Sequence, residues 1–225
     1  MRNSGIDASL EYHQPLGKDL HLTVRGNFTY ARNRIMDQDE PDYAYTYMNH
    51  SGQMQWQKFG LVAAGLFQDQ EDIDSWAKQS FGEVKPGDIK YLDLNGDRKI
   101  DGNDVTMLGY PTVPEIIYGL GASIQYKNFD FSFFFQGVDH VSLEMQDHHP
   151  FVSKAYSGRN MTQWIADDHW SEANPDPNAA YPRLSHVWNE NNTQASSFWI
   201  RNGAYLRLKS AEVGYTYRSF RFYVA

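Results

Sequence analysis

The residues best suited to chemistry lie in one twelve-residue segment, 93–104, which reads DLNGDRKIDGND. When Asp93 is counted as position 1, oxygen-bearing side chains fall at positions 1, 3, 5, 9 and 12, and position 7 offers a backbone carbonyl. The candidate ligands are Asp93, Asn95, Asp97, Lys99 (through its carbonyl), Asp101 and Asp104. This is the spacing of an EF-hand calcium loop, and Ca²⁺ prefers six to eight hard oxygen ligands. The segment therefore predicts a calcium site.

Two positions depart from the calcium-loop pattern. Position 12 is Asp104, which is shorter than the usual bidentate glutamate, and position 6 is Arg98, where glycine normally makes the sharp turn. The alternative is an Asp- and Asn-rich surface turn that holds no ion. A bound ion would stabilise a loop rather than take part in catalysis, because no nucleophile-and-base arrangement accompanies the segment. We therefore do not expect an enzyme.

The elements that would position this loop are long alternating segments. Four of them alternate with a period of two: Ile6–His13, Leu20–Ala31, Ile116–Tyr126 and Phe129–Gln136. Each is predicted to be a strand with one apolar and one largely polar face. No apolar-face position is charged, as a lipid-facing wall requires, because a mid-membrane Lys or Arg costs roughly 2–4 kcal/mol. A soluble β-sandwich would bury such faces too, but strands of about 11 residues are typical of membrane barrels.

The connections alternate between short and long. Short turns join the strands of three hairpins, whereas long polar stretches, 33–114 and 139–204, separate the hairpins. Outer-membrane barrels alternate short periplasmic turns with long extracellular loops. The segment 53–67 is expected not to cross the membrane, and the change of phase within 205–217 predicts a β-bulge near Lys209 and Ser210. We thus expect an all-β chain of six strands that forms part of a large antiparallel transmembrane β-barrel.

Composition narrows the function classes. The 225 residues include 20 Lys and Arg against 28 Asp and Glu, and the resulting charge of −8 gives no support to nucleic-acid binding. Cysteine is absent, which excludes disulfides, thiolate metal sites and cysteine nucleophiles. The mean hydropathy is −0.64, no apolar run is long enough for a transmembrane helix, and no signal peptide follows Met1.

Two groups of residues are candidates for ligand contact. The predicted lumen-facing side chains are Asp7, Glu11, His13, Arg25 and Gln125. All six tryptophans lie outside the predicted strands, so they either form small cores within the long loops or offer exposed rings to sugars. The sequence alone leaves both alternatives open and identifies no substrate-binding residue.

Several motifs resemble those of one family. The segment PGDIKYLDLNGD (86–97) is followed by Gly109–Pro111, FDFSFFFQG (129–137), Trp170–Pro175, Tyr181–Leu184 and Tyr205–Lys209. Together these segments resemble the SusC/RagA family of TonB-linked outer-membrane proteins along nearly the whole chain. Arg98 is a departure, because the family usually has glycine there.

The resemblance implies a 22-stranded barrel with an N-terminal plug, located in the outer membrane. At about 10 residues a strand, 22 strands need about 220 residues before any loop. We therefore expect residues 1–225 to be a partial barrel region that lacks the plug and the TonB-contacting segment. The resemblance also implies import of oligosaccharides, other glycans or peptides, with a SusD-like lipoprotein and the TonB complex as partners. The alternative is a secreted, calcium-stabilised β-sandwich that binds carbohydrate.

Overall fold

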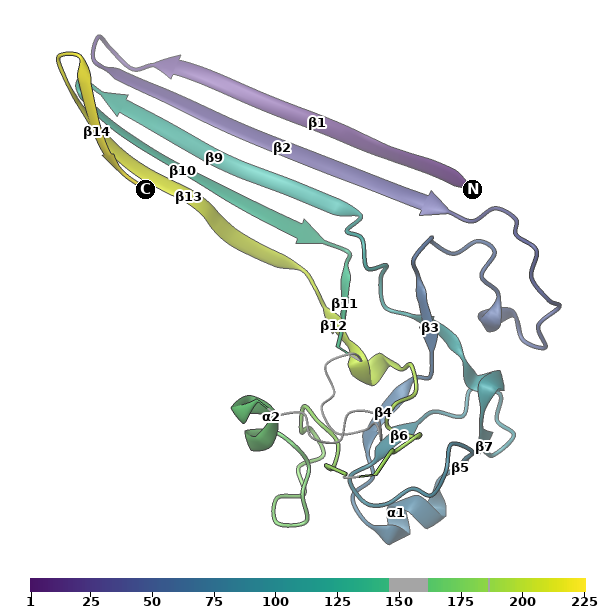
Figure 1. The fold of residues 1–225 in the computed structure, drawn as a ribbon. Coiled ribbons are helices and arrows are strands. Elements are labelled where there is room, and N and C mark those ends of the chain that lie inside the picture. The colour runs from purple at the N-terminus through teal and green to yellow at the C-terminus, as the bar shows by residue number, and fades with distance from the viewer. Residues whose placement is uncertain (146–161, 186) are drawn as a thin grey trace.

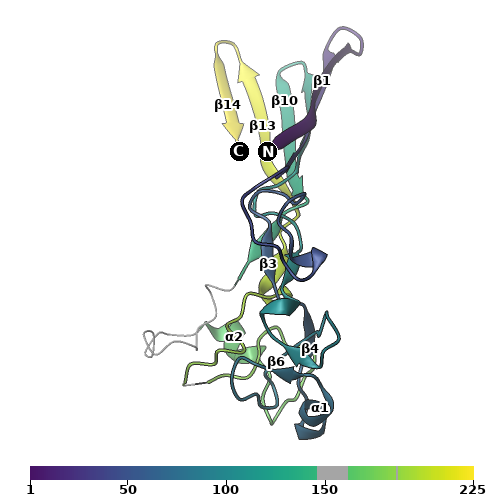
Figure 2. The ribbon, with the colours of Figure 1, turned by 90° about the vertical axis from the view of Figure 1, so that its right-hand side faces the viewer.

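A computed structural model describes residues 1–145, 162–185 and 187–225 of the chain. The architecture has two parts: a long antiparallel sheet, and a compact module of loops beyond one end of it (Figures 1 and 2). In the described part of the chain, no helix is long and apolar enough to cross a membrane.

The sheet has six strands. They are β1 (Arg2–Pro15), β2 (Leu20–Arg34), β9 (Ile116–Tyr126), β10 (Phe129–Asp139), β13 (Tyr205–Tyr217) and β14 (Phe220–Val224). Their order is β1-β2-β9-β10-β13-β14, and every neighbouring pair is antiparallel. The three short turns lie together at one end of the sheet, and both long segments leave from the other end (Figure 1).

The structure confirms the predicted strands and extends three of them, because pairing continues past the clean alternation. The predicted bulge is present: Phe134 pairs with Ser210 and Phe135 with Leu208, so Lys209 has no partner on β10. The segment 53–67 does not join the sheet. It contains the short strands β3 (Lys58–Gly60) and β4 (Ala63–Leu66), which pair outside it.

The sheet is a single layer. Its apolar face is uncovered: Leu10 is 73% exposed, Leu120 57% and Phe131 41%. The rings of Phe131, Phe133 and Phe135 contact one another along β10 rather than a second sheet. A β-sandwich requires a packed second layer, so the described residues give the sandwich alternative no support.

Residues 35–115 and the described part of 140–204 form the loop module. Besides β3 and β4, its strands are β5 (Lys78–Gln79), β6 (Ile89–Tyr91), β7 (Lys99–Ile100), β8 (Thr106–Leu108), β11 (Ser142–Glu144) and β12 (Ile200–Asn202). Its helices are α1 (Gln70–Ser75), α2 (Gln163–Asp167) and the 3₁₀ turns η1 (Thr46–Met48), η2 (Gly102–Asp104) and η5 (Ser197–Trp199).

The module has its own hydrophobic core, drawn from both long segments. The buried residues include Leu61, Leu66, Ile89, Tyr91, Ile100, Ile165, Trp170, Tyr181 and Trp199. Trp170 and Trp199 are thus core residues, and the partly buried Trp76 packs against this core. Trp56, Trp164 and Trp188 remain exposed, so the core alternative holds for only some of the tryptophans.

Candidate functional site

The polar face of the sheet is the first candidate site. The register places polar-face positions opposite one another: Arg25 on β2 lies opposite Glu11 on β1 and opposite Gly121 on β9. All five predicted lumen-facing residues lie on this face, because side chains alternate strictly along β1, β2 and β9. The structure separates them into small groups rather than gathering all of them at one place.

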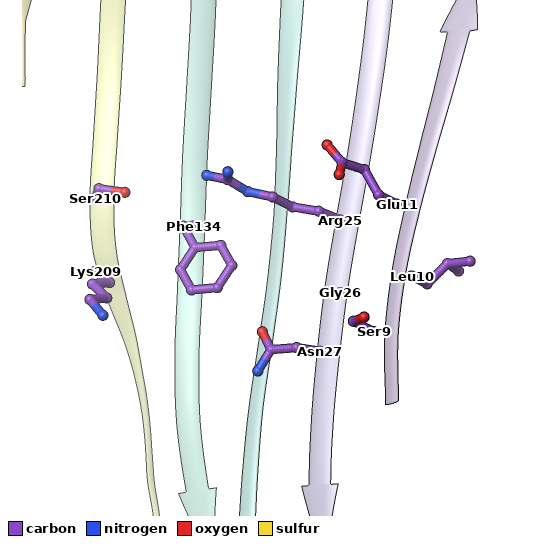
Figure 3. Close-up of a pocket in the computed structure, with 9 residues that line it drawn as sticks. All are labelled: Ser9, Leu10, Glu11, Arg25, Gly26, Asn27, Phe134, Lys209 and Ser210. Carbon is purple, nitrogen blue, oxygen red and sulfur yellow. The ribbon is translucent and has the colours of Figure 1, made fainter. Parts of the chain in front are cut away.

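A trough of about 600 Å³ runs across this face between β1 and β13 (Figure 3). Its lining residues are Ser9, Leu10, Glu11, Arg25, Gly26, Asn27, Phe134, Lys209 and Ser210. Arg25 reaches from β2 over β9 toward the ring of Phe134 on β10, and its guanidinium carbon lies 5.3 Å from the ring centroid. The trough therefore combines an aromatic surface, a cation–π contact and hydrogen-bonding groups.

Two glycines make room for the aromatic ring of the trough. A Cβ added at Gly119 would lie 2.5 Å from Cζ of Phe134, and one at Gly121 would lie 2.7 Å from Cδ2 of the same ring. Only glycine at both positions lets the ring lie against β9. Sequence reasoning did not single out Phe134. The available signal was an aromatic residue on a polar face, opposite alternate glycines on the neighbouring strand.

Other polar-face residues are already paired. Thr29 donates a hydrogen bond to Asp7 over 3.1 Å, and His13 contacts Thr23 at 2.9 Å. Arg221 on β14 forms ion pairs with Asp130 on β10, at 2.5 Å, and with Glu212 on β13. The first two contacts join β1 to β2, and Arg221 joins β14 to its neighbour β13 and, across it, to β10. Of the predicted lumen residues, only Glu11 and Arg25 line the trough.

The predicted calcium loop has the backbone of a tight turn. Arg98, at the position where glycine is usual, has φ +66°, and Gly96 has φ +76°. Asp93 accepts hydrogen bonds from the amides of Gly96 and Arg98, each over 2.7 Å. Arg98 therefore adopts the left-handed conformation that the glycine would supply, which is unfavourable for a residue with a Cβ.

The side-chain oxygens of this loop are turned toward protein donors. Fully buried Asp104 accepts from the amides of Leu94 and Asp101, both over 2.8 Å, and closes a capping box. Lys99 Nζ lies 2.6 Å from Asp101, and that hydrogen bond, together with one from the Asn103 amide, lowers the pKa of Asp101. Within the described ranges, no group of three or more His, Asp or Glu is arranged to hold a metal. That criterion leaves out the Asn95 amide and the Lys99 carbonyl, so calcium stays a prediction.

A buried polar network joins the two long segments of the loop module. Asp88 is fully buried, and its Oδ1 lies 2.7 Å from Nε of Arg183. The same carboxylate accepts hydrogen bonds from the side-chain amides of Asn189 and Asn192, each over 2.8 Å. A carboxylate withdrawn from water needs several such partners. The two segments are therefore held as one unit.

The chain is similar in sequence to TonB-dependent receptors. No family profile matches the chain. The chain is 32% identical over 161 residues to the TonB-dependent receptor P26 of Formosa agariphila, an alignment that covers 69% of this chain and 15% of the receptor. It is 22% identical to the TonB-dependent receptor SusC of Bacteroides thetaiotaomicron, over 97% of this chain and 21% of SusC.

A solved structure of the RagAB peptide transporter has a similar fold. It superposes with a TM-score of 0.64 at 16% identity, over 95% of this chain and 22% of that one. The RagAB peptide importer in its "open-open" state gives a TM-score of 0.57 at 17% identity. This chain therefore spans about 15–22% of the length of these relatives.

These similarities agree with the single-layered sheet, one face of which is apolar and the other polar. The chain is thus a TonB-dependent receptor sequence, and receptors of this class are β-barrel proteins of the outer membrane. Within that class, it belongs to the SusC/RagA family.

Proposed function

We propose that this chain forms barrel wall and two extracellular loops of a transporter that imports glycans or peptides. The polarity of the six-stranded sheet is the observation that carries the proposal: an uncovered apolar face on one side, and a polar face with a trough on the other. The relatives are named as TonB-dependent receptors, and one solved relative is named as a peptide transporter. Transport rather than catalysis is the function that this geometry supports.

In this proposal the segments 33–114 and 139–204 lie outside the cell. Barrels of this kind place short turns at the periplasm and long loops outside, and the structure has all three short turns at one end. A single cysteine at exposed Glu172 of the loop module should react with a membrane-impermeant maleimide on intact cells. A single cysteine at Ser219, in the turn before β14, should react only after the outer membrane is permeabilised. The reverse pattern would contradict the proposal.

The loop module is the proposed contact for a SusD-like lipoprotein. Trp56, Trp164 and Trp188 are exposed on it, although the module has enough core to bury other tryptophans. Large exposed aromatic side chains are enriched at protein interfaces. A photo-crosslinking residue at Trp188 should yield a covalent complex with the lipoprotein, whereas one at Ser219 should not. TonB would supply the energy through the receptor's plug region.

The trough is the proposed place where the transported molecule contacts this part of the wall. Phe134 offers a ring for stacking, and Arg25, Glu11 and Asn27 offer hydrogen bonds. Replacing Phe134 by leucine should reduce uptake of the cognate substrate while leaving the folded barrel intact. Replacing the lipid-facing Phe131 by leucine is the matched control, because it changes the same strand on the opposite face. Equal uptake by the two variants would show that the trough does not contact the transported molecule.

A further inference from the structure

We propose that three arginines at the loop end of β1 and β2 bind the phosphate group of an outer-leaflet lipid. Arg2, Arg32 and Arg34 line a cavity of about 340 Å³ together with Ser4, Tyr30 and Met36. The proposal rests on the proposed function for one point, namely that this end of the sheet faces the outside of the cell.

The arginines stand on the apolar face of the sheet. Arg2 pairs directly with Arg34, Ser4 with Arg32, and Ile6 with Tyr30. Residues two apart on a strand point to the same side, so the three arginines share a face with Ile6 and Tyr30. This is the face that carries the exposed Leu10. The guanidinium groups therefore face the membrane rather than the lumen.

Their height along the strand matches the lipid head groups. On β2, the apolar face runs from Leu20 to Tyr30, which is roughly 34 Å at about 3.4 Å per residue. With a strand tilt of about 40°, this corresponds to roughly 26 Å across the membrane, close to the apolar band of about 25 Å in such barrels. Arg32 and Arg34 follow Tyr30 by two and four residues. They consequently lie just beyond the hydrocarbon boundary, where the phosphates of lipids lie.

The cluster has an excess of positive charge. Like charges directly opposite each other on paired strands destabilise a sheet, and Arg2 is directly opposite Arg34. Arg32 Nε lies 3.2 Å from the buried carboxylate of Glu115, whose other oxygen lies 3.2 Å from His140. Within the described residues, Arg2 and Arg34 form no ion pair. The site therefore lacks counter-charge for two guanidinium groups.

A phosphate monoester matches this arrangement. It carries a charge of about −1.5 to −2 at neutral pH and presents three acceptor oxygens. Arginine binds such groups through two parallel N–H donors, which a set of facing arginines can supply from two strands. Free phosphate has the same chemistry. A lipid phosphate is favoured because the cavity opens onto the apolar face, where acyl chains would contact Ile6 and Phe28.

The test measures lipid binding by the detergent-solubilised receptor that contains this chain. The probes are diphosphorylated lipid A, its dephosphorylated form and inorganic phosphate. The wild type should bind the diphosphorylated lipid at least about tenfold more tightly than the dephosphorylated one, the factor expected for one charge-assisted hydrogen bond. The double variant Arg2→Gln/Arg34→Gln should lose this preference. Arg207→Gln, on the polar face of β13 and outside both cavities, is the control and should retain it.

A second readout separates loss of binding from loss of folding. Because the double variant removes a repulsive pair, its melting temperature without lipid should equal or exceed that of the wild type, and lipid should no longer raise it. Unchanged lipid preference in the double variant would overturn the proposal. Saturation by inorganic phosphate at the concentrations at which lipid A binds would overturn the lipid assignment. These measurements involve neither transport nor orientation, so their failure is distinct from a failure of the cysteine-labelling test.

Discussion

Gly87 and Trp170 are in such close contact that a Cβ on Gly87 would lie 2.1 Å from Cε3 of the indole. Gly87 comes from the first long segment of the loop module and Trp170 from the second. Beside this contact, the Arg183 amide donates to the carbonyl of Gly87 over 2.9 Å, and the Arg183 side chain pairs with Asp88. Apolar packing and a buried ion pair therefore join the two segments at the same place.

Substitution of Gly87 by alanine should destabilise the loop module by about 2–4 kcal/mol. The methyl group would overlap the indole ring, and φ of +84° is unfavourable for alanine. Hydrogen exchange of the Asp88 and Ile89 amides should increase accordingly. Gly82→Ala is the matched control, because Gly82 has φ +110° with no heavy atom within 4 Å of the added Cβ. Equal effects at the two positions would show that backbone strain, not packing, is responsible.

Substitution of Arg98 by glycine should stabilise the 93–104 loop by about 1 kcal/mol. Arg98 has φ +66°, a conformation that glycine adopts without steric penalty. Slower hydrogen exchange across residues 93–104 in the variant would confirm this. Faster exchange would show that contacts of the Arg98 side chain stabilise the loop by more than the left-handed backbone of Arg98 destabilises it.

If the loop binds calcium, the ion should stabilise the receptor in proportion to its occupancy. At a calcium concentration 100 times the Kd, the gain is about 2.7 kcal/mol. The measurement is thermal unfolding with calcium or with a chelator, for the wild type and for Asp93→Asn. Asp74→Asn, at an exposed position of α1, is the control. An identical melting temperature with calcium and with chelator would end the calcium prediction.

Protonation of Glu40 should loosen the segment 38–51 at low pH. Its carboxylate accepts from the amides of Ser51, over 2.9 Å, and His50, over 3.0 Å. Hydrogen bonding to Ser51 is the largest cause that lowers the pKa of Glu40 from 4.5 to about 2. The stabilisation is therefore complete above about pH 4.5 and is lost as the pH falls toward 2. Hydrogen exchange of residues 50–51 should follow this range, and Glu40→Gln should remove the dependence.

The two faces of β9 should respond differently to charge. Leu120 lies on the apolar face and Ser123 on the polar face. Leu120→Arg should destabilise the barrel by about 2–4 kcal/mol, because the charge would lie in hydrocarbon. Ser123→Arg should have a much smaller effect. Unfolding of the receptor in lipid bilayers measures both, and equal effects would contradict the assignment of the faces.

The sequence by itself determined the sheet. Alternation is a local property, so neighbouring residues were enough to predict the strands, their two faces, the three hairpins and the bulge at Lys209. The spacing of the 93–104 loop was readable for the same reason. The directions of its carboxylate oxygens were not, because they depend on which backbone amides the fold brings near.

Only the tertiary structure decided how distant residues meet. Asp88 and Arg183 are 95 positions apart, and no local pattern predicts that one buried carboxylate joins them. The pairing of β9 with β10 places Phe134 against Gly119 and Gly121. The register of β1 with β2 places Arg2 opposite Arg34. Pairing and packing couple residues that are far apart in sequence, which is why these sites emerged only when the chain was folded.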